Sequence, residues 1–183
     1  MQAIFMLTCL YLSKVLVAQT NPTPQSIPYS ENFTSLVATS TTYPAGWQGW
    51  TLAAAAPTAA HLNTAPTADR TLTASGTAAS TGGNVYNYNG KLGFLSTGSL
   101  TPTAVFSINS TGKQSIVVNY DMMLIRNPFD GTTANNRVLE AVLQYRIGNT
   151  GSFTTVTGTE YVSNTTLQTT TTTNPLNSIP IAT

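Results

Sequence analysis

Four aromatic residues are the first candidates for chemistry in this sequence, because exposed tryptophan and tyrosine rings can stack on the apolar faces of sugars. Trp47 and Trp50 lie in the segment YPAGWQGWTL, and Tyr86 and Tyr88 alternate with asparagines in NVYNYN. Residues two apart on a strand share a face, so Tyr86 and Tyr88 could form a ligand platform. The alternative is that these rings fill a core or close its end, which is a common use of aromatic residues in β-sandwiches.

Polar residues that follow one of the longer apolar segments are a second set of candidate ligand contacts. The segment RNPFDGTTANN, residues 126–136, is rich in turn-forming residues and contains Asp130 and Asn135. Carboxylate and amide groups of this kind can hydrogen-bond to the hydroxyls of a sugar. The alternative interpretation is a solvated loop without a ligand.

Groups able to catalyse a reaction are scarce in the chain. It has 6 Asp and Glu in total, 1 His and 1 Cys, too few for a zinc site, a disulfide framework or a cysteine–histidine nucleophile. Asp121 and Glu140 are the one carboxylate pair that strand geometry could bring together as a glycosidase requires, and cross-strand pairing with arginine is the alternative. His61 could act only in a Ser-His-acid catalytic system, and the chain has no Gly-x-Ser-x-Gly element to supply the serine. We therefore predict a protein that is not an enzyme and needs no cofactor.

The charge and composition of the chain exclude one class of partner and favour one class of fold. The 183 residues include 7 Lys and Arg, the formal net charge is +1, and only 7% of residues are charged. Such a chain cannot supply the basic patch that nucleic-acid binding requires, so we expect no nucleic acid as partner. About one residue in five is threonine, and β-branched residues favour strands. The composition therefore predicts one all-β domain.

The first residues predict export. Residues 4–17 form a mostly apolar run, IFMLTCLYLSKVLV, and the chain turns polar after Ala18. This pattern is typical of a secretory signal peptide spanning residues 1–18, with a retained anchor as the alternative. We expect a secreted or cell-surface protein without a membrane span after cleavage, because the run is shorter than the roughly 20 residues that cross a bilayer. The β-sandwich module would cover residues 19–163, and a threonine-rich tail, residues 164–183, would be a linker or an edge strand.

Short strands bounded by Gly, Asn or Ser are expected along the module. They cover Arg70–Ala74, Asn84–Asn89, Lys91–Ser96, Ala104–Asn109 and Phe153–Thr157. The same pattern predicts an extended start over Gln25–Phe33, a Pro-Ala-Gly turn within Tyr43–Leu52 and a loop over Ala53–Asp69.

Two longer segments, Ser115–Ile125 and Arg137–Ile147, carry the strongest strand signal. Apolar and mixed positions alternate along both, as they do in an antiparallel sheet with one buried face. The expected apolar faces are Ile116, Val118, Tyr120, Met122 and Leu124 in the first segment, and Leu139, Ala141, Leu143, Tyr145 and Ile147 in the second. A helix over the second segment is the alternative on propensity.

Five segments together carry a resemblance to a known family: IPYSENF, YPAGWQGW, NVYNYNGKLGFLSTGS, IVVNYDMMLIRNPFDGTTANNRVLEAVLQYRIG and TGSFTTV. They resemble the N-terminal jelly-roll module of large secreted Bacteroidota proteins, many of which are cargo of the type IX secretion system. The module is more distantly similar to MAM-type and concanavalin-like sandwiches. The likeness covers nearly the whole mature chain and implies an antiparallel β-sandwich of the jelly-roll type.

The resemblance also implies two features that this chain carries only in part, the final strands of the sandwich and a calcium site. Members of this kind continue with further strands, so the chain resembles a C-terminally truncated module that lacks its last strands. An exposed sheet edge would then be open to a partner strand. By the same resemblance Glu31 would be one ligand of a structural calcium ion, although the paired aspartates that would complete such a site are absent.

We therefore expect a non-catalytic module that serves adhesion or binds a polysaccharide or cell-surface glycan within a larger exported protein. Two alternatives stay open. The chain could be the accessory domain of a secreted hydrolase or nuclease whose catalytic domain lies beyond Thr183. It could also be a structural subunit that exchanges a strand with its neighbour.

Overall fold

The computed structural model describes residues 19–53, 62–77, 79–124, 140–162, 174–175 and 181–182. These residues form strands, turns and loops and contain no helix, so the expected all-β class is confirmed for this part of the chain. Within the same ranges no helix is long and apolar enough to cross a membrane. The expected signal peptide lies outside the described residues.

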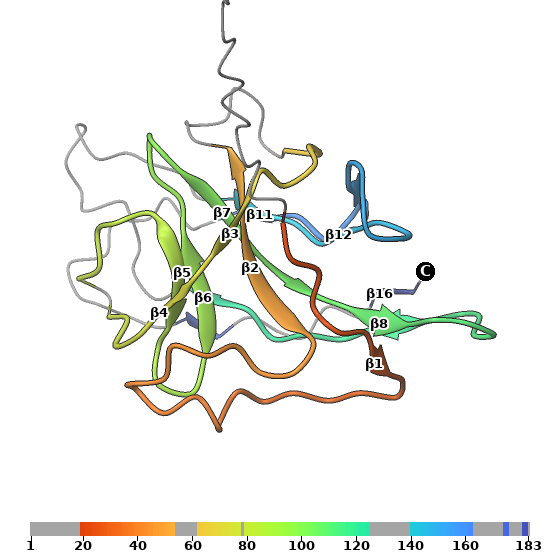
Figure 1. Ribbon diagram of the computed structural model, residues 1–183, viewed down its shortest axis with the longest axis horizontal. Helices are drawn as coiled ribbons and strands as arrows, with labels where there is room; N and C mark the ends of the chain where they lie inside the picture. Colours follow the sequence, from red (N-terminus) through yellow and green to blue (C-terminus); the bar gives the residue numbers. More distant parts are fainter. Residues whose placement is uncertain are drawn as a thin grey trace, which may run out of the picture.

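The strands are short and pair into several small sheets (Figure 1). They are β1 (Gln25–Ser26), β2 (Trp47–Ala53), β3 (Ala68–Arg70), β4 (Leu72–Thr73), β5 (Asn84–Asn87), β6 (Leu92–Leu95), β7 (Thr101–Phe106), β8 (Ile108–Asn109), β9 (Val117–Val118), β10 (Met123–Leu124), β11 (Glu140–Ala141), β12 (Gln144–Tyr145), β13 (Thr154–Thr155), β14 (Tyr161–Val162), β15 (Asn174–Pro175) and β16 (Ile181–Ala182).

Two of the sheets have three strands, in the orders β3-β2-β7 and β4-β5-β6. The others are two-stranded pairs: β1 with β8, β9 with β16, β10 with β15, β11 with β14, and β12 with β13. Only β1–β8 and β4–β5 are parallel among these described pairs. The described strands form a set of small, mostly antiparallel sheets. The two continuous sheets expected of a jelly roll are not shown by these strands.

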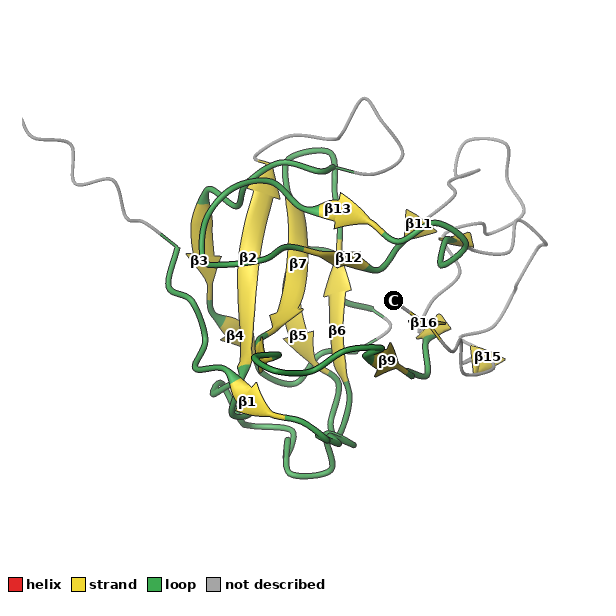
Figure 2. Ribbon diagram, turned by 90° about the vertical axis from the view of Figure 1, so that its right-hand side faces the viewer, coloured by secondary structure: helices red, strands yellow, loops and turns green. Residues whose placement is uncertain are grey.

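Strand β2 is central to its sheet, and a tight turn sets its start. The backbone N–H of Trp47 donates to the carbonyl of Pro44 at 3.0 Å, and Gly46 takes a φ of +82°. Glycine at the third position of a four-residue turn is what a type II turn requires. The expected Pro-Ala-Gly turn is therefore confirmed, while the strand that follows it is a feature that the turn signals did not predict. Figure 2 shows β2 lying between β3 and β7.

The two three-stranded sheets share one small core. Leu36, Leu72 and Val85 are almost fully buried, and Tyr43 and Ala104 pack against them. These residues come from β4, β5, β7 and the loop before β2, so the apolar contact joins both sheets. Their burial removes apolar surface from water, which is the main driving force for bringing the sheets together.

A buried asparagine fixes the loop that leads into β2. Asn87 is 0% exposed; its Nδ2 donates to the carbonyls of Val37 at 2.7 Å and Ser40 at 3.1 Å. Its Oδ1 accepts a hydrogen bond from the N–H of Asn89 at 2.9 Å. A buried amide is stable only when its polar atoms have partners, so this network ties β5 to the loop.

The segment after the expected signal peptide is held against β2 and β3. The N–H of Thr20 donates to Asp69 Oδ1 at 2.7 Å, and Trp50 Nε1 donates to the Thr20 carbonyl at 3.1 Å. The guanidinium of Arg146 lies 4.8 Å from the Trp50 ring and 4.9 Å from the Phe153 ring. A guanidinium this close to both rings is attracted to each of them by a cation–π interaction.

Most of the short strands fall where the turn signals place them. Strands β4, β5, β6 and β13 lie inside expected segments, and the segment Ala104–Asn109 contains the end of β7 and all of β8. Residues 62–67 have no regular structure, as expected of a loop. The expected loop boundary at Asp69 is wrong, because Ala68 already begins β3.

The two longest expected strands have different outcomes. Over residues 115–122 the odd positions are exposed and the even positions half-buried, so the predicted alternation is confirmed in burial. The strands in this first segment are shorter than expected. In its described part, residues 115–124, the strands are β9, which pairs with β16, and β10, which pairs with β15.

The predicted apolar face of the second segment is wrong at its end. Tyr145 is 48% exposed and Ile147 is 92% exposed, whereas Gln144 and Arg146 are half-buried. Gln144 turns inward because its Nε2 donates to the Leu62 carbonyl at 3.1 Å, and Arg146 because it lies against Trp50. The helical alternative is also wrong over the described residues 140–147, which contain β11 and β12.

Candidate functional site

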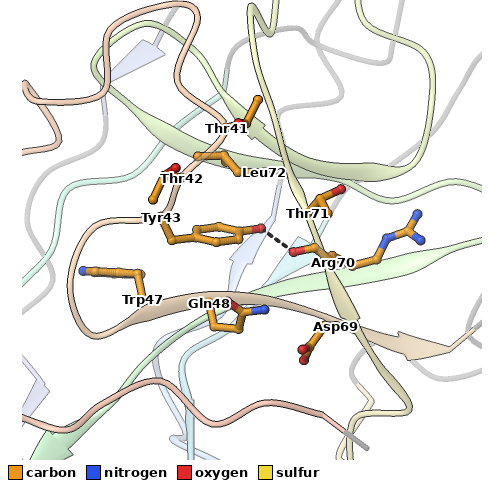
Figure 3. Close-up of a pocket in the computed structure, with 9 residues that line it drawn as sticks. All are labelled: Thr41, Thr42, Tyr43, Trp47, Gln48, Asp69, Arg70, Thr71 and Leu72. Atoms are coloured by element: carbon orange, nitrogen blue, oxygen red, sulfur yellow. Dashed lines mark hydrogen bonds between the residues drawn. The ribbon is translucent and has the colours of Figure 1, made fainter. Parts of the chain in front are cut away.

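A groove of about 480 Å³ opens beside Tyr43, where the loop before β2, the start of β2 and the β3–β4 segment meet (Figure 3). Its lining consists of Thr41, Thr42, Tyr43, Trp47, Gln48, Asp69, Arg70, Thr71 and Leu72. The groove therefore combines aromatic and aliphatic carbon with hydroxyl, amide and charged groups. Ligand sites commonly have this mixed character and a volume of roughly 300–1,000 Å³.

The ring of Tyr43 runs across the groove and its hydroxyl points toward β3 (Figure 3). That hydroxyl donates to the backbone carbonyl of Arg70 at 3.0 Å. Burial raises the pKa of Tyr43, so the phenol is neutral at ordinary pH. Gly49 makes room for the ring, because a β-carbon at this position would overlap the Tyr43 hydroxyl and lie 3.0 Å from Val85 Cγ2.

Asp69 and Arg70 supply both signs of charge from neighbouring positions of β3. Asp69 Oδ1 accepts the N–H of Thr20 at 2.7 Å, and Arg70 Nη2 donates to the Gly83 carbonyl at 3.4 Å. In Figure 3 the two side chains leave β3 on opposite sides, and the guanidinium of Arg70 points away from Tyr43. Consecutive side chains of a strand face opposite ways, so a ligand beside Tyr43 would not meet both charged groups together.

Gln48 and three threonines complete the polar part of the lining. Gln48 is half-buried on β2, while Thr41, Thr42 and Thr71 are exposed. An amide and a hydroxyl can each donate and accept hydrogen bonds. Groups of this kind suit a ligand that carries many hydroxyls, and they hold no strong nucleophile.

Trp47 and Trp50, the two predicted tryptophans, have different positions. Trp47 lines the groove, but in Figure 3 its indole points away from Tyr43. The indole packs against Phe33 and Phe106, each with ring centroids 5.0 Å away. Trp50 is only 1% exposed, so its ring has no face open to a ligand and the alternative of a core residue describes it.

Tyr86 and Tyr88 lie next to each other as predicted, but their rings are too buried to form an open platform for a ligand. The two ring centroids are 5.7 Å apart, which confirms that both side chains lie on one side of the segment. Tyr86 is 8% exposed and its hydroxyl donates to the Gly82 carbonyl at 2.6 Å. Tyr88 is half-buried, and burial raises its pKa.

Glu31 stabilises a local turn. Its Oε1 accepts the N–H of Phe33 at 2.6 Å, and Phe33 has a positive φ of 59°. The described residues contain no group of three or more His, Cys, Asp and Glu side chains that could hold a metal ion. Calcium binding by Glu31 stays a prediction from the resemblance.

The remaining predicted residues are not brought together. Asp130, Asn135 and His61 lie outside the described residues. Asp121 precedes β10, which pairs with β15, while Glu140 begins β11, which pairs with β14. The expected neighbouring-strand geometry for a carboxylate pair is therefore absent from the described ladders.

The sequence patterns do not mark four of the groove residues, Tyr43, Gln48, Asp69 and Arg70. They come from two segments whose closeness depends on the pairing of β2 with β3, in which Trp50 lies opposite Asp69. No motif marks that pairing in the sequence. The one usable signal is the adjacent acid and base, Asp69 and Arg70, in a chain with only 7% charged residues.

Comparison with known proteins adds no relative: no protein family, curated protein or solved structure matches this chain. The resemblance to secreted jelly-roll modules therefore stays a prediction. The function has to be inferred from the chemistry of the groove itself.

Proposed function

We propose that this chain is a non-catalytic, sugar-binding module of a secreted or cell-surface protein, and that the groove beside Tyr43 holds the sugar. The observation that carries the proposal is the arrangement of the lining: an aromatic ring across the groove, with the side chains of Gln48 and Asp69 beside it. A sugar ring has apolar C–H faces and hydroxyls at its edge, so it matches an aromatic ring surrounded by hydrogen-bonding groups.

The carboxylate content of the described part of the groove lining favours binding over hydrolysis. Among the lining residues that the structure describes, only Asp69 carries a carboxylate. Glycosidases generally place two carboxyl groups about 5 to 10 Å apart around the bond they cleave. A groove with one carboxylate, already bonded to the N–H of Thr20, is better suited to holding a hydroxyl.

The finer architecture belongs to the same proposal. We infer a jelly-roll-like sandwich in which the β3-β2-β7 and β4-β5-β6 sheets are parts of two facing layers. Their shared core of Leu36, Leu72 and Val85 supports this interpretation, since facing sheets of a sandwich bury their inner sides against each other. The module would present the groove within a larger exported protein that serves adhesion.

A pull-down with insoluble polysaccharides tests the proposal. The protein is incubated with cellulose, chitin, cross-linked dextran and xylan, together with Gln48→Ala and a matched control, Gln114→Ala, whose exposed side chain lies outside the groove. We expect at least one polysaccharide to retain the protein and Gln48→Ala to weaken retention several-fold, while Gln114→Ala behaves as the parent. Retention by none of them, or equal loss in both variants, would refute the assignment.

A further inference from the structure

The two sides of the groove beside Tyr43 come from separate segments of the chain, and strand β5 is connected to both of them. One side is the β3–β4 segment, residues 69–72, and Leu72 of that segment pairs with Val85 of β5. The other side is residues 41–43, which belong to no strand (Figure 3). Since β5 is the central strand of the β4-β5-β6 sheet, it can serve as a fixed reference for both sides.

Asn87 of β5 holds the turn that leads into residues 41–43. The turn runs from Val37 to Ser40 and is closed by the Ser40 N–H, which donates to the Val37 carbonyl at 2.8 Å. Asn87 Nδ2 donates to the carbonyls at both ends of this turn, at 2.7 Å for Val37 and 3.1 Å for Ser40. Asn87 is 0% exposed and does not line the groove, so it can influence a ligand there only through the turn.

Ser40 extends this hydrogen-bonded connection to the groove lining. Its Oγ accepts the N–H of Thr42 at 3.4 Å and donates to the Thr42 carbonyl at 3.3 Å. The next residue is Tyr43, whose hydroxyl reaches the Arg70 carbonyl on the opposite side of the groove. A chain of contacts therefore leads from the buried side chain of Asn87 to the lining, and Ser40 is not itself part of that lining.

We propose that Asn87 and Ser40 are positioning residues of the sugar site, an inference that rests on the proposed sugar-binding function. They hold residues 41–43 in place before the sugar arrives. A segment that is already ordered loses less conformational freedom on binding, so the affinity is higher without any added contact to the ligand. Loss of the Ser40 hydroxyl should therefore weaken binding by about two- to tenfold, the range that one hydrogen bond accounts for.

Ser40→Ala is the main variant, and Ser75→Ala is its matched control. Ser75 Oγ donates to the Ala38 carbonyl of the same turn at 3.2 Å, but Ala38 does not line the groove. The Ser75 N–H also donates to this carbonyl, at 2.7 Å, so the turn keeps its backbone contact in the control. Both variants remove a serine hydroxyl from the surroundings of one turn, and we expect similar, small shifts of the urea midpoint. Ser40→Thr keeps the hydroxyl and should bind as the parent does.

Affinity electrophoresis in gels containing hydroxyethyl-cellulose, glycol chitin, dextran or arabinoxylan measures the binding. With the polymer that retards the parent protein, we expect Ser40→Ala to lose about two- to tenfold in affinity and Ser75→Ala and Ser40→Thr less than about twofold. Asn87→Ala should also weaken binding, and adding Ser40→Ala to it should cost less than in the parent, because both changes act on the same residues.

The outcomes separate this inference from the proposed function. Unchanged affinity of Ser40→Ala, or equal weakening by Ser40→Ala and Ser75→Ala, would overturn the positioning role alone. Failure of all four polymers to retard the parent protein would refute the proposed function and this inference with it. The comparison of the two serine variants does not depend on whether Asn87→Ala folds.

Discussion

Replacing Gly49 by alanine tests whether β2 is built to accommodate Tyr43. The new methyl group would overlap the Tyr43 hydroxyl and lie 3.0 Å from Val85 Cγ2, a side chain that is 0% exposed. Overpacking of this kind costs about 1–3 kcal/mol, and loss of the hydrogen bond to the Arg70 carbonyl costs about 1 kcal/mol. We expect Gly49→Ala to lower the free energy of unfolding by about 2–4 kcal/mol in urea titrations.

Gly98→Ala is the matched control, because a β-carbon at Gly98 meets nothing within 4 Å. Both substitutions reduce the entropy of the unfolded chain equally, so the difference between them isolates the clash. Combining Gly49→Ala with Tyr43→Phe removes the overlapping oxygen, and the pair should cost about 1–2 kcal/mol less than the sum of the single changes. Equal stability of Gly49→Ala and Gly98→Ala, or strict additivity with Tyr43→Phe, would refute this account of the groove.

Asn87→Ala should lower the free energy of unfolding by about 2–4 kcal/mol, because it removes three buried hydrogen bonds. The control Asn119→Ala, at an exposed position, should change that free energy by less than about 0.5 kcal/mol. Similar losses of unfolding free energy for both variants in urea titrations would contradict this. Arg146→Leu should cost about 1–2 kcal/mol by removing the stacked guanidinium, and it should alter tryptophan fluorescence, while Ile147→Ala, at a 92% exposed position, leaves both unchanged. Burial raises the pKa of Tyr43 above 10.0, so the unfolded chain loses that proton first and stability should fall as the pH rises above about 10. Tyr43→Phe should reduce this alkaline loss, and an unchanged pH profile would count against the burial.

The parts of the fold that the sequence predicts well are those that depend on local signals. Turn residues bound β5 and β6, and the type II turn at Gly46 follows from a Pro-Ala-Gly segment whose glycine takes a positive φ. The alternation at residues 115–122 is also local, because it depends only on which side chains prefer burial. Such features need no knowledge of the partner strand.

Long-range contacts account for what the sequence could not predict. Arg146 and Gln144 look like surface residues in the pattern, but aromatic rings and backbone carbonyls from distant segments draw them inward. Their inward turn leaves Ile147 exposed. The groove is missed for the same reason, since Tyr43 and Arg70 are separated by 27 positions and meet through one hydrogen bond. A periodicity argument has no information about such pairings.

The most direct test of the central claim is an amide ¹⁵N–¹H chemical-shift titration of the protein with oligosaccharides from the polysaccharide that retains it. We expect the largest shift changes around the groove, at residues 41–43, at Gln48 and at residues 69–71. Changes confined to residues 86–88 or 126–136, or spread evenly over the sheets without a maximum, would contradict the assignment of the groove as the sugar site.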